Sequence, residues 1–135
     1  MEDKDRKDRK DRKRRILLVD DNRSLGATVK RQLADHDCEC TVMASGMDAL
    51  CEIMDNRPDM ILVDIDAPEL NGLQLCALLK NHQEYRAISV VLLADKSDIF
   101  LQARAQALQA ELILTKPFAR TELLKAVAAE ISHAA

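Results

Sequence analysis

The chain has 135 residues, a formal charge of −3 and only 2% aromatic residues, with no tryptophan. This length suits one domain with a substantial core and is too short for two. The scarcity of aromatic rings disfavours nucleic-acid binding by base stacking. Hydrophobic residues still make up 47% of the chain, so the core must be filled by Leu, Ile, Val, Met and Ala.

The charges are unevenly distributed. Residues 1–15 carry nine basic and five acidic side chains, whereas the remaining 120 carry eleven basic and eighteen acidic ones. The Lys-Asp-Arg repeats from Lys4 to Arg12 offer no apolar residue, so we predict a disordered charged arm at 1–14 and a folded domain at 15–135. The acidic remainder argues against a nucleic-acid groove in that domain. The arm could tether the domain to an anionic partner, but its interspersed aspartates favour an inert role.

Cysteine use and hydropathy indicate the compartment. Cys38, Cys40, Cys51 and Cys76 include no Cys-x-x-Cys pair, and we expect buried or half-buried thiols in a reducing cytosol. No secretory apolar region and no run of membrane-spanning length is present. We therefore predict a cytoplasmic protein without membrane insertion.

Short apolar runs and longer amphipathic segments alternate along the chain five times. In the second helix, Met47, Leu50, Cys51 and Met54 are spaced i, i+3, i+4, i+7, which predicts one apolar face. The expected elements, in chain order, are a strand at 16–19, a helix at about 24–35, a strand at 39–44, a helix at about 46–56, a strand at 60–64, a helix at 73–81, a strand at 89–93, a helix at 98–108, a strand at 111–115 and a helix at 120–132.

The expected strands predict an α/β fold. Several read as unbroken apolar runs, as expected for strands buried on both faces of a parallel sheet covered by helices. Right-handed crossovers then favour a doubly wound, five-stranded sheet of order 2-1-3-4-5 with five helices. Such sheets bind ligands between the first and third strands, and these are the strands that end at Asp20-Asp21 and Asp64.

Asp20, Asp21, Asp64 and Lys116 are therefore expected to gather at one edge of the sheet. Three close carboxylates repel one another, and a divalent cation with oxygen ligands relieves that repulsion and favours an incoming phosphoryl group. Two plainer interpretations stay open. Any one of Asp20, Asp21 and Asn22 could simply cap the following helix, and Lys116 alone would be an ordinary surface lysine.

The segment Pro58–Gly72, with Asp20-Asp21 upstream and Lys116-Pro117-Phe118 downstream, resembles the receiver domain of two-component response regulators. The resemblance extends from about Ile16 to the carboxyl terminus and implies a CheY-like, flavodoxin-like fold in a signalling module that is not an enzyme. It implies that Asp64 accepts a phosphoryl group from a histidine kinase or a histidine phosphotransfer protein. Mg²⁺ would be held directly by Asp21 and Asp64, through water by Asp20, and by the Asp66 backbone carbonyl. Lys116 would bind the phosphoryl oxygens.

Two positions depart from the family pattern. Ala94 stands where the family usually has Thr or Ser, whose hydroxyl binds the phosphoryl group, and Ile113 stands where an aromatic residue usually turns inward upon phosphorylation. We therefore expect intact acceptor chemistry with altered or weak coupling to the output. The resemblance also implies that the Asp66 side chain, two residues past the acceptor, modulates the lifetime of the acyl phosphate.

No DNA-binding or catalytic domain follows Ser132, so we expect output through a partner protein that contacts about Asp98–Ser132. Short segments near Leu75–Asn81 and Ile99-Phe100 are similar to stand-alone receivers of type IV pilus, twitching-motility systems. One alternative is a pseudo-receiver that only docks, independently of phosphorylation. Another is a haloacid-dehalogenase-like phosphatase, because Asp64-Ile65-Asp66 forms an Asp-x-Asp signature, although the acidic residues such enzymes need late in the chain are missing.

Overall fold

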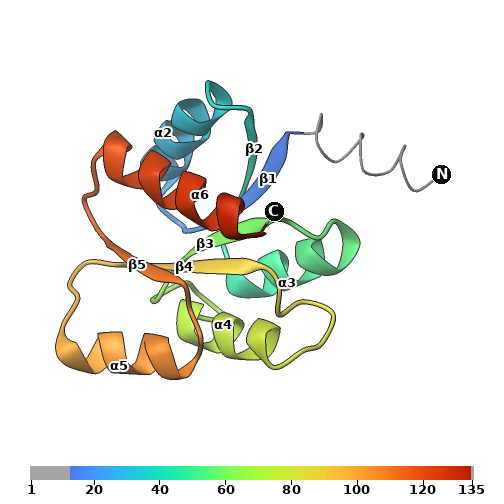
Figure 1. Cartoon of the computed structure of the whole chain (residues 1–135), viewed down its shortest axis with the longest axis vertical. Helices are drawn as coiled ribbons and strands as arrows, with labels where there is room; N and C mark the ends of the chain where they lie inside the picture. The colour runs from blue at the N-terminus through green and yellow to red at the C-terminus, as the bar shows by residue number, and fades with distance from the viewer. Residues whose placement is uncertain (1–12, 135) are drawn as a thin grey trace.

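A computed structural model describes residues 13–134 of the chain. It contains a parallel sheet of order β2-β1-β3-β4-β5, which confirms the predicted topology. Each strand is followed by a helix (Figure 1), and the described elements are β1 (Arg14–Val19), α2 (Arg23–Ala34), β2 (Cys38–Met43), α3 (Gly46–Asp55), β3 (Met60–Asp64), α4 (Gly72–Lys80), β4 (Ser89–Ala94), α5 (Ile99–Ala107), β5 (Leu112–Thr115) and α6 (Arg120–Ala134).

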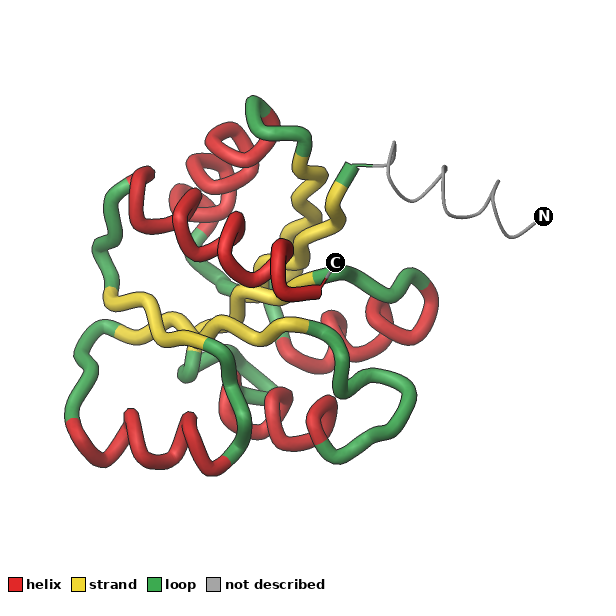
Figure 2. The backbone as a smooth tube through the Cα atoms, viewed as in Figure 1, coloured by secondary structure: helices red, strands yellow, loops and turns green. Residues whose placement is uncertain are grey.

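Helices cover both faces of the sheet (Figure 2). Successive strand residues point to opposite faces, so Ile16 and Leu18 of β1 pack in a core with α2 and α6. Leu17 and Val19 pack in a second core with α3, α4 and α5. Both faces of the sheet are buried, which explains the unbroken apolar runs in the sequence.

The sheet begins earlier than the apolar pattern indicates. Arg14 pairs with Cys38, and Arg15 with Glu39, so β1 starts two residues before the expected Ile16. Both arginine side chains are half-buried rather than core-facing, and periodicity therefore gave no sign of them. The predicted charged arm, apart from Lys13 and Arg14, lies outside the described residues.

The predicted apolar face of α3 is wrong in part. Met47 and Met54 are 44% and 57% exposed and Cys51 is exposed, whereas Ala49 and Ile53 are the buried residues. The reason is a tight contact at the start of the helix. A Cβ on Gly46 would lie 1.8 Å from the Leu70 carbonyl oxygen, so this side of α3 must face the 68–70 loop. The expectation of buried or half-buried thiols holds for Cys38, Cys40 and Cys76 and fails for Cys51.

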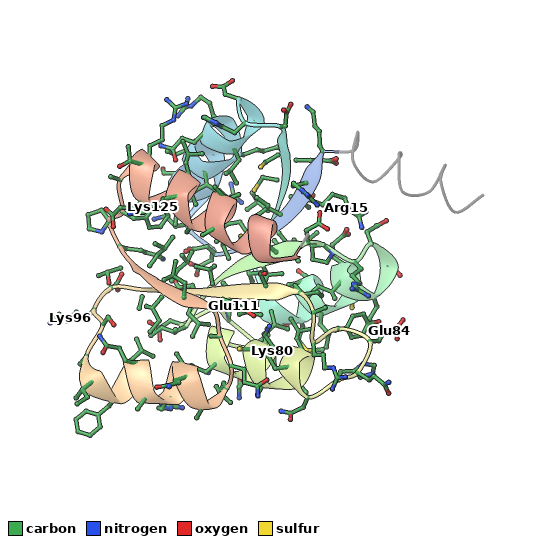
Figure 3. All side chains as sticks on the ribbon, in the orientation of Figure 1. Arg15, Lys80, Glu84, Lys96, Glu111 and Lys125 are labelled. Carbon is green, nitrogen blue, oxygen red and sulfur yellow. The ribbon has the colours of Figure 1, made fainter. Side chains whose placement is uncertain are left out.

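A partly buried ion pair ties α4 to the residue before β5, and the sequence pattern gave no sign of it. The Lys80 Nζ donates to Glu111 Oε1 at 2.5 Å and to the Ile88 carbonyl at 2.8 Å (Figure 3). Glu111 Oε2 accepts the Val90 amide at 2.6 Å. The lysine side chain is only 6% exposed, so this pair fastens α4 and the 86–88 segment to the sheet. None of the helices in residues 13–134 has the length and apolar character needed to cross a membrane.

Candidate functional site

The predicted site residues lie where strands end at one edge of the sheet. β1 and β3 are neighbours, Asp20 directly follows β1, and Asp64 is the last residue of β3. Lys116 directly follows β5, and its amide donates to the Ala94 carbonyl at the end of β4. Because all five strands are parallel, their carboxyl ends meet at this edge, and residues far apart in sequence come together there.

Asp20, Asp64 and Lys116 form one ion-paired group. The Lys116 Nζ donates to Asp20 Oδ2 at 2.6 Å and also to Asp64 Oδ2. The Asp20 side chain is 1% exposed, and those of Asp64 and Lys116 are each 17% exposed. Burial alone lowers the pKa of Lys116, but hydrogen bonds and attraction to the two carboxylates outweigh it and raise that pKa above its usual value. The ammonium is therefore firmly charged.

The backbone holds the second oxygen of each carboxylate. Asp20 Oδ1 accepts the Asn22 amide at 2.9 Å, and Asp64 Oδ1 accepts the Asp66 amide at 2.7 Å. Asn22 itself caps α2 by accepting the Leu25 amide, so the helix does not need Asp20 or Asp21 as its cap. The alternative capping role is thus taken by Asn22, and Asp20 is left to pair with Lys116.

Close packing fixes the loop that follows Asp64. A Cβ on Gly72 would lie 2.7 Å from the Asp64 carbonyl oxygen, so only glycine lets α4 begin this near the strand. The Ala67 amide donates to that same carbonyl at 3.1 Å. The Asp64 carboxylate is therefore carried by closely packed backbone at a defined position.

Comparison with known proteins decides the family. The sequence model of the response regulator receiver domain matches residues 16–128. The chain belongs to this family. Receiver domains are signalling modules rather than classical enzymes.

Relatives and solved structures agree with this assignment. The receiver is 34% identical to protein PilG of Pseudomonas aeruginosa over 87% of each chain. It is 31% identical to response regulator MprA of Mycobacterium sp. strain KMS over 82% of its own length, and it spans about half of that protein, 47%. A putative response regulator from Chloroflexus aurantiacus superposes with a TM-score of 0.84 at 26% identity, covering 90% of this chain and 99% of that one.

One further solved structure of a receiver domain contains a metal ion. The receiver domain of sensor histidine kinase PA1611 from Pseudomonas aeruginosa superposes with a TM-score of 0.80 at 24% identity, over 89% of this chain and 98% of that one. It was determined with a magnesium ion coordinated in its active-site cleft. At 24% identity the likeness establishes a shared fold. Whether the present receiver can bind a metal ion depends on its own residues.

The residues at the acidic edge fit a magnesium ion. In residues 13–134 no three His, Cys, Asp or Glu side chains are grouped as a ready set of metal ligands, and Lys116 pairs with both Asp20 and Asp64. Asp21 and Asp66 are exposed beside them. Mg²⁺ commonly keeps several waters and takes only one or two carboxylates, so the carboxylates of Asp20, Asp21 and Asp64 are sufficient in number and chemistry. A Mg²⁺ ion bound here would replace the Lys116 ammonium as the counter-charge of the Asp20 and Asp64 carboxylates.

The two positions that depart from the family pattern lie in the neighbouring strands β4 and β5. Ala94 is 1% exposed at the end of β4 and pairs in register with Thr115, next to Lys116. Its methyl group cannot donate a hydrogen bond. Ile113 is half-buried in β5 and packs against the core on the side of α3, α4 and α5. An aliphatic side chain held there has no hydroxyl or ring edge to exchange between core and solvent.

Proposed function

We propose that the chain is the phosphoacceptor module of a two-component or chemosensory pathway, with Asp64 as the acceptor. The observation that carries the proposal is the shared ion pairing of Asp20, Asp64 and Lys116 at the carboxyl edge of β1, β3 and β5. This ion pairing joins three strand ends where α/β sheets bind their ligands.

The chemistry follows from these residues. A carboxylate oxygen of Asp64 attacks the phosphorus of a phosphohistidine, the P–N bond breaks, and an acyl phosphate forms. A bound Mg²⁺ would neutralise charge on the phosphoryl oxygens, held by Asp21 and Asp64 directly, by Asp20 through water and by the Asp66 carbonyl. Lys116 supplies a compact mobile charge that can leave the Asp64 carboxylate and follow the phosphoryl oxygens.

A small phosphodonor tests the proposal directly. The full chain is incubated with acetyl phosphate with and without Mg²⁺, and intact mass is measured. We expect one added phosphoryl group that needs Mg²⁺, is cleaved by hydroxylamine as an acyl phosphate is, and is lost in Asp64→Asn. Asp98→Asn is the matched control, because Asp98 caps α5 away from the site. Absence of both metal binding and modification would support the phosphorylation-independent docking module instead.

Coupling from the acceptor to the output is proposed to be weak. The basis is Ala94 and Ile113, which remove a hydroxyl contact and an aromatic rotor from the neighbourhood of Asp64. A phosphate mimic on Asp64 should then change amide exchange in α5 and β5 only slightly in the natural protein. The double variant Ala94→Thr/Ile113→Tyr should increase that change. A large response in the natural protein, above the usual coupling of about 1–3 kcal/mol, would contradict the idea.

Asp66 is proposed to set the lifetime of the acyl phosphate. Its side chain is exposed, and its amide donates to Asp64 Oδ1 at 2.7 Å, so Asp66 lies directly beside the proposed acceptor carboxylate. The lifetime is measured in the natural protein and in Asp66→Asn, with Glu69→Gln, another exposed acid of the same loop, as control. Equal decay of the natural protein and Asp66→Asn would exclude a role for this carboxylate.

The remaining parts of the proposal concern partners and place. Receiver domains act with histidine kinases and effectors, and we assign a histidine kinase or phosphotransfer protein as donor here. Output is assigned to protein contacts over about 98–132, where Ile99 and Phe100 are 74% and 77% exposed. The likeness to PilG supports a twitching-motility type of pathway. The cytoplasm is the proposed location, because that is where phosphohistidine donors are made.

A further inference from the structure

Helix α3 presents an apolar stripe that the fold does not use. Met47, Cys51 and Met54 are spaced i, i+4, i+7 and all are exposed. The opposite side of the helix, with Ala49 and Ile53, already fills the core. The neighbouring helix α4 adds another exposed apolar residue, Leu78, at 49%. The stripe is therefore surplus to folding.

The stripe cannot rotate into the core. The Gly46 amide donates to the Pro68 carbonyl at 3.0 Å, and no side chain fits between Gly46 and Leu70. The Ser45 hydroxyl caps the helix by accepting the Asp48 amide at 3.1 Å. These contacts fix the helix about its own axis, so the methionines stay at the surface in the native fold.

Acidic residues border the stripe on one side. Asp48, Glu52 and Asp55 repeat the same i, i+4, i+7 spacing one position further along, and α3 contains no Lys or Arg. Like charges at this spacing destabilise a helix, and an acid in the last turn opposes the helix dipole. Asp48 in the first turn favours the helix dipole, and Glu52 accepts a hydrogen bond from the Asn56 side chain at 3.2 Å, but neither contact explains Asp55. Recognition of a cationic partner accounts for the row as a whole.

We propose that this α3 face, made of Met47, Cys51, Met54, Asp48, Glu52 and Asp55, docks a basic amphipathic helix of a partner protein. Methionine side chains are flexible and polarisable and adapt to varied apolar partners. A helix with leucines on one stripe and Lys or Arg on the adjacent stripe matches both rows at once. The face is separate from the exposed Ile99-Phe100 pair on α5 and does not depend on the proposed acceptor chemistry.

Methyl NMR on the full chain tests the proposal. The protein is labelled at the methionine methyl groups and titrated with a synthetic 18-residue helix of Leu and Lys. We expect the Met47 and Met54 signals to move with saturation, while Met60, which is fully buried in β3, stays in place. A peptide with Glu in place of every Lys should not bind. Signals that shift with protein concentration alone would replace the partner helix by a second copy of this chain.

Variants then separate the α3 face from general attraction to an acidic protein. Met47→Gln/Met54→Gln keeps the charge and should weaken the Leu/Lys peptide at least about tenfold. Asp48→Asn/Asp55→Asn should weaken it about threefold to tenfold at low salt. The matched control, Asp35→Asn/Glu84→Gln, removes two exposed acids elsewhere and should change affinity less than twofold. Equal binding by Met47→Gln/Met54→Gln and the natural protein would overturn the proposal.

Discussion

Replacing Lys116 by methionine should make the stability of the domain depend strongly on Mg²⁺. In the natural protein the ammonium is shared by Asp20 Oδ2 and Asp64 Oδ2. Lys116→Met keeps the length of the side chain but leaves two neighbouring carboxylates without a counter-charge. Removing one partner of a buried pair costs about 3–5 kcal/mol. Because Asp64 is 17% exposed whereas Asp20 is 1% exposed, we expect about 2–4 kcal/mol without metal.

Magnesium should recover much of this loss. A cation that binds only the native state stabilises it by RT ln(1 + [Mg²⁺]/Kd), or about 2.7 kcal/mol at a hundredfold excess over Kd. In the natural protein Mg²⁺ must also release the ammonium from both carboxylates, so its apparent affinity is lower. Thermal unfolding followed by circular dichroism, at several Mg²⁺ concentrations, should show a larger rise in Tm for Lys116→Met than for the natural protein.

Two controls make this test specific. Lys80→Met also removes a buried lysine, but one that pairs with Glu111 away from the acidic edge, so its response to Mg²⁺ should equal that of the natural protein. Asp20→Asn/Lys116→Met removes one of the two competing carboxylates and should reduce the Mg²⁺ effect. If Lys116→Met gains no more from Mg²⁺ than the natural protein, the ammonium and the metal do not share these carboxylates, and the reasoning is refuted.

Three further predictions concern the rest of the fold. Burial raises the pKa of Cys40 and Cys76 to about 11, so at pH 8 only about one molecule in a thousand has the thiolate at each position. A maleimide should therefore label the exposed Cys51 first, and fast labelling of Cys76 would contradict its burial. Gly46→Ala should lower the free energy of unfolding, measured in urea, by about 2–3 kcal/mol, because the added methyl group collides with the Leu70 carbonyl. As the control, Ala27→Gly at an exposed position of α2 should lower it by about 1 kcal/mol. Lys80→Met should lower the free energy of unfolding by about 2–4 kcal/mol, and Glu111→Gln should lower it less, because the amide oxygen of Gln still accepts one hydrogen bond. Since such hydrogen bonds usually contribute more than about 0.5 kcal/mol, a smaller loss for Lys80→Met would show that the pair is not stabilising.

The fold was predictable because each level of the sequence agreed with the next. Apolar runs such as Met60–Val63 are buried on both faces, so their lack of alternation itself indicates a parallel sheet. Placing Asp20 and Asp64 at the ends of neighbouring strands needed only the strand order. The meeting of Lys116 with these carboxylates followed from the same topology, since every strand delivers its carboxyl end to one edge.

What the sequence could not show depends on packing between elements. Periodicity places Met47, Leu50, Cys51 and Met54 on one side of α3, but it does not say which side meets the sheet. That choice is made by the fit of Gly46 against Leu70, a contact between segments that only the folded chain brings together. The pairing of Lys80 with Glu111 is hidden for the same reason, because 31 residues separate them.

The packing of Gly46 against the 68–70 loop also links α3 to β3, the strand that ends at Asp64. Asp64 begins a loop whose Pro68 carbonyl accepts the Gly46 amide, and whose end at Gly72 packs against the Asp64 carbonyl. β3, the 65–71 loop and the amino-terminal ends of α3 and α4 are therefore one packed unit. This unit connects Asp64 to α3 through backbone contacts that involve neither Ala94 nor Ile113. The hydroxyl and the aromatic ring that are missing at Ala94 and Ile113 would lie in β4 and β5, whereas this packing around Asp64 involves neither position.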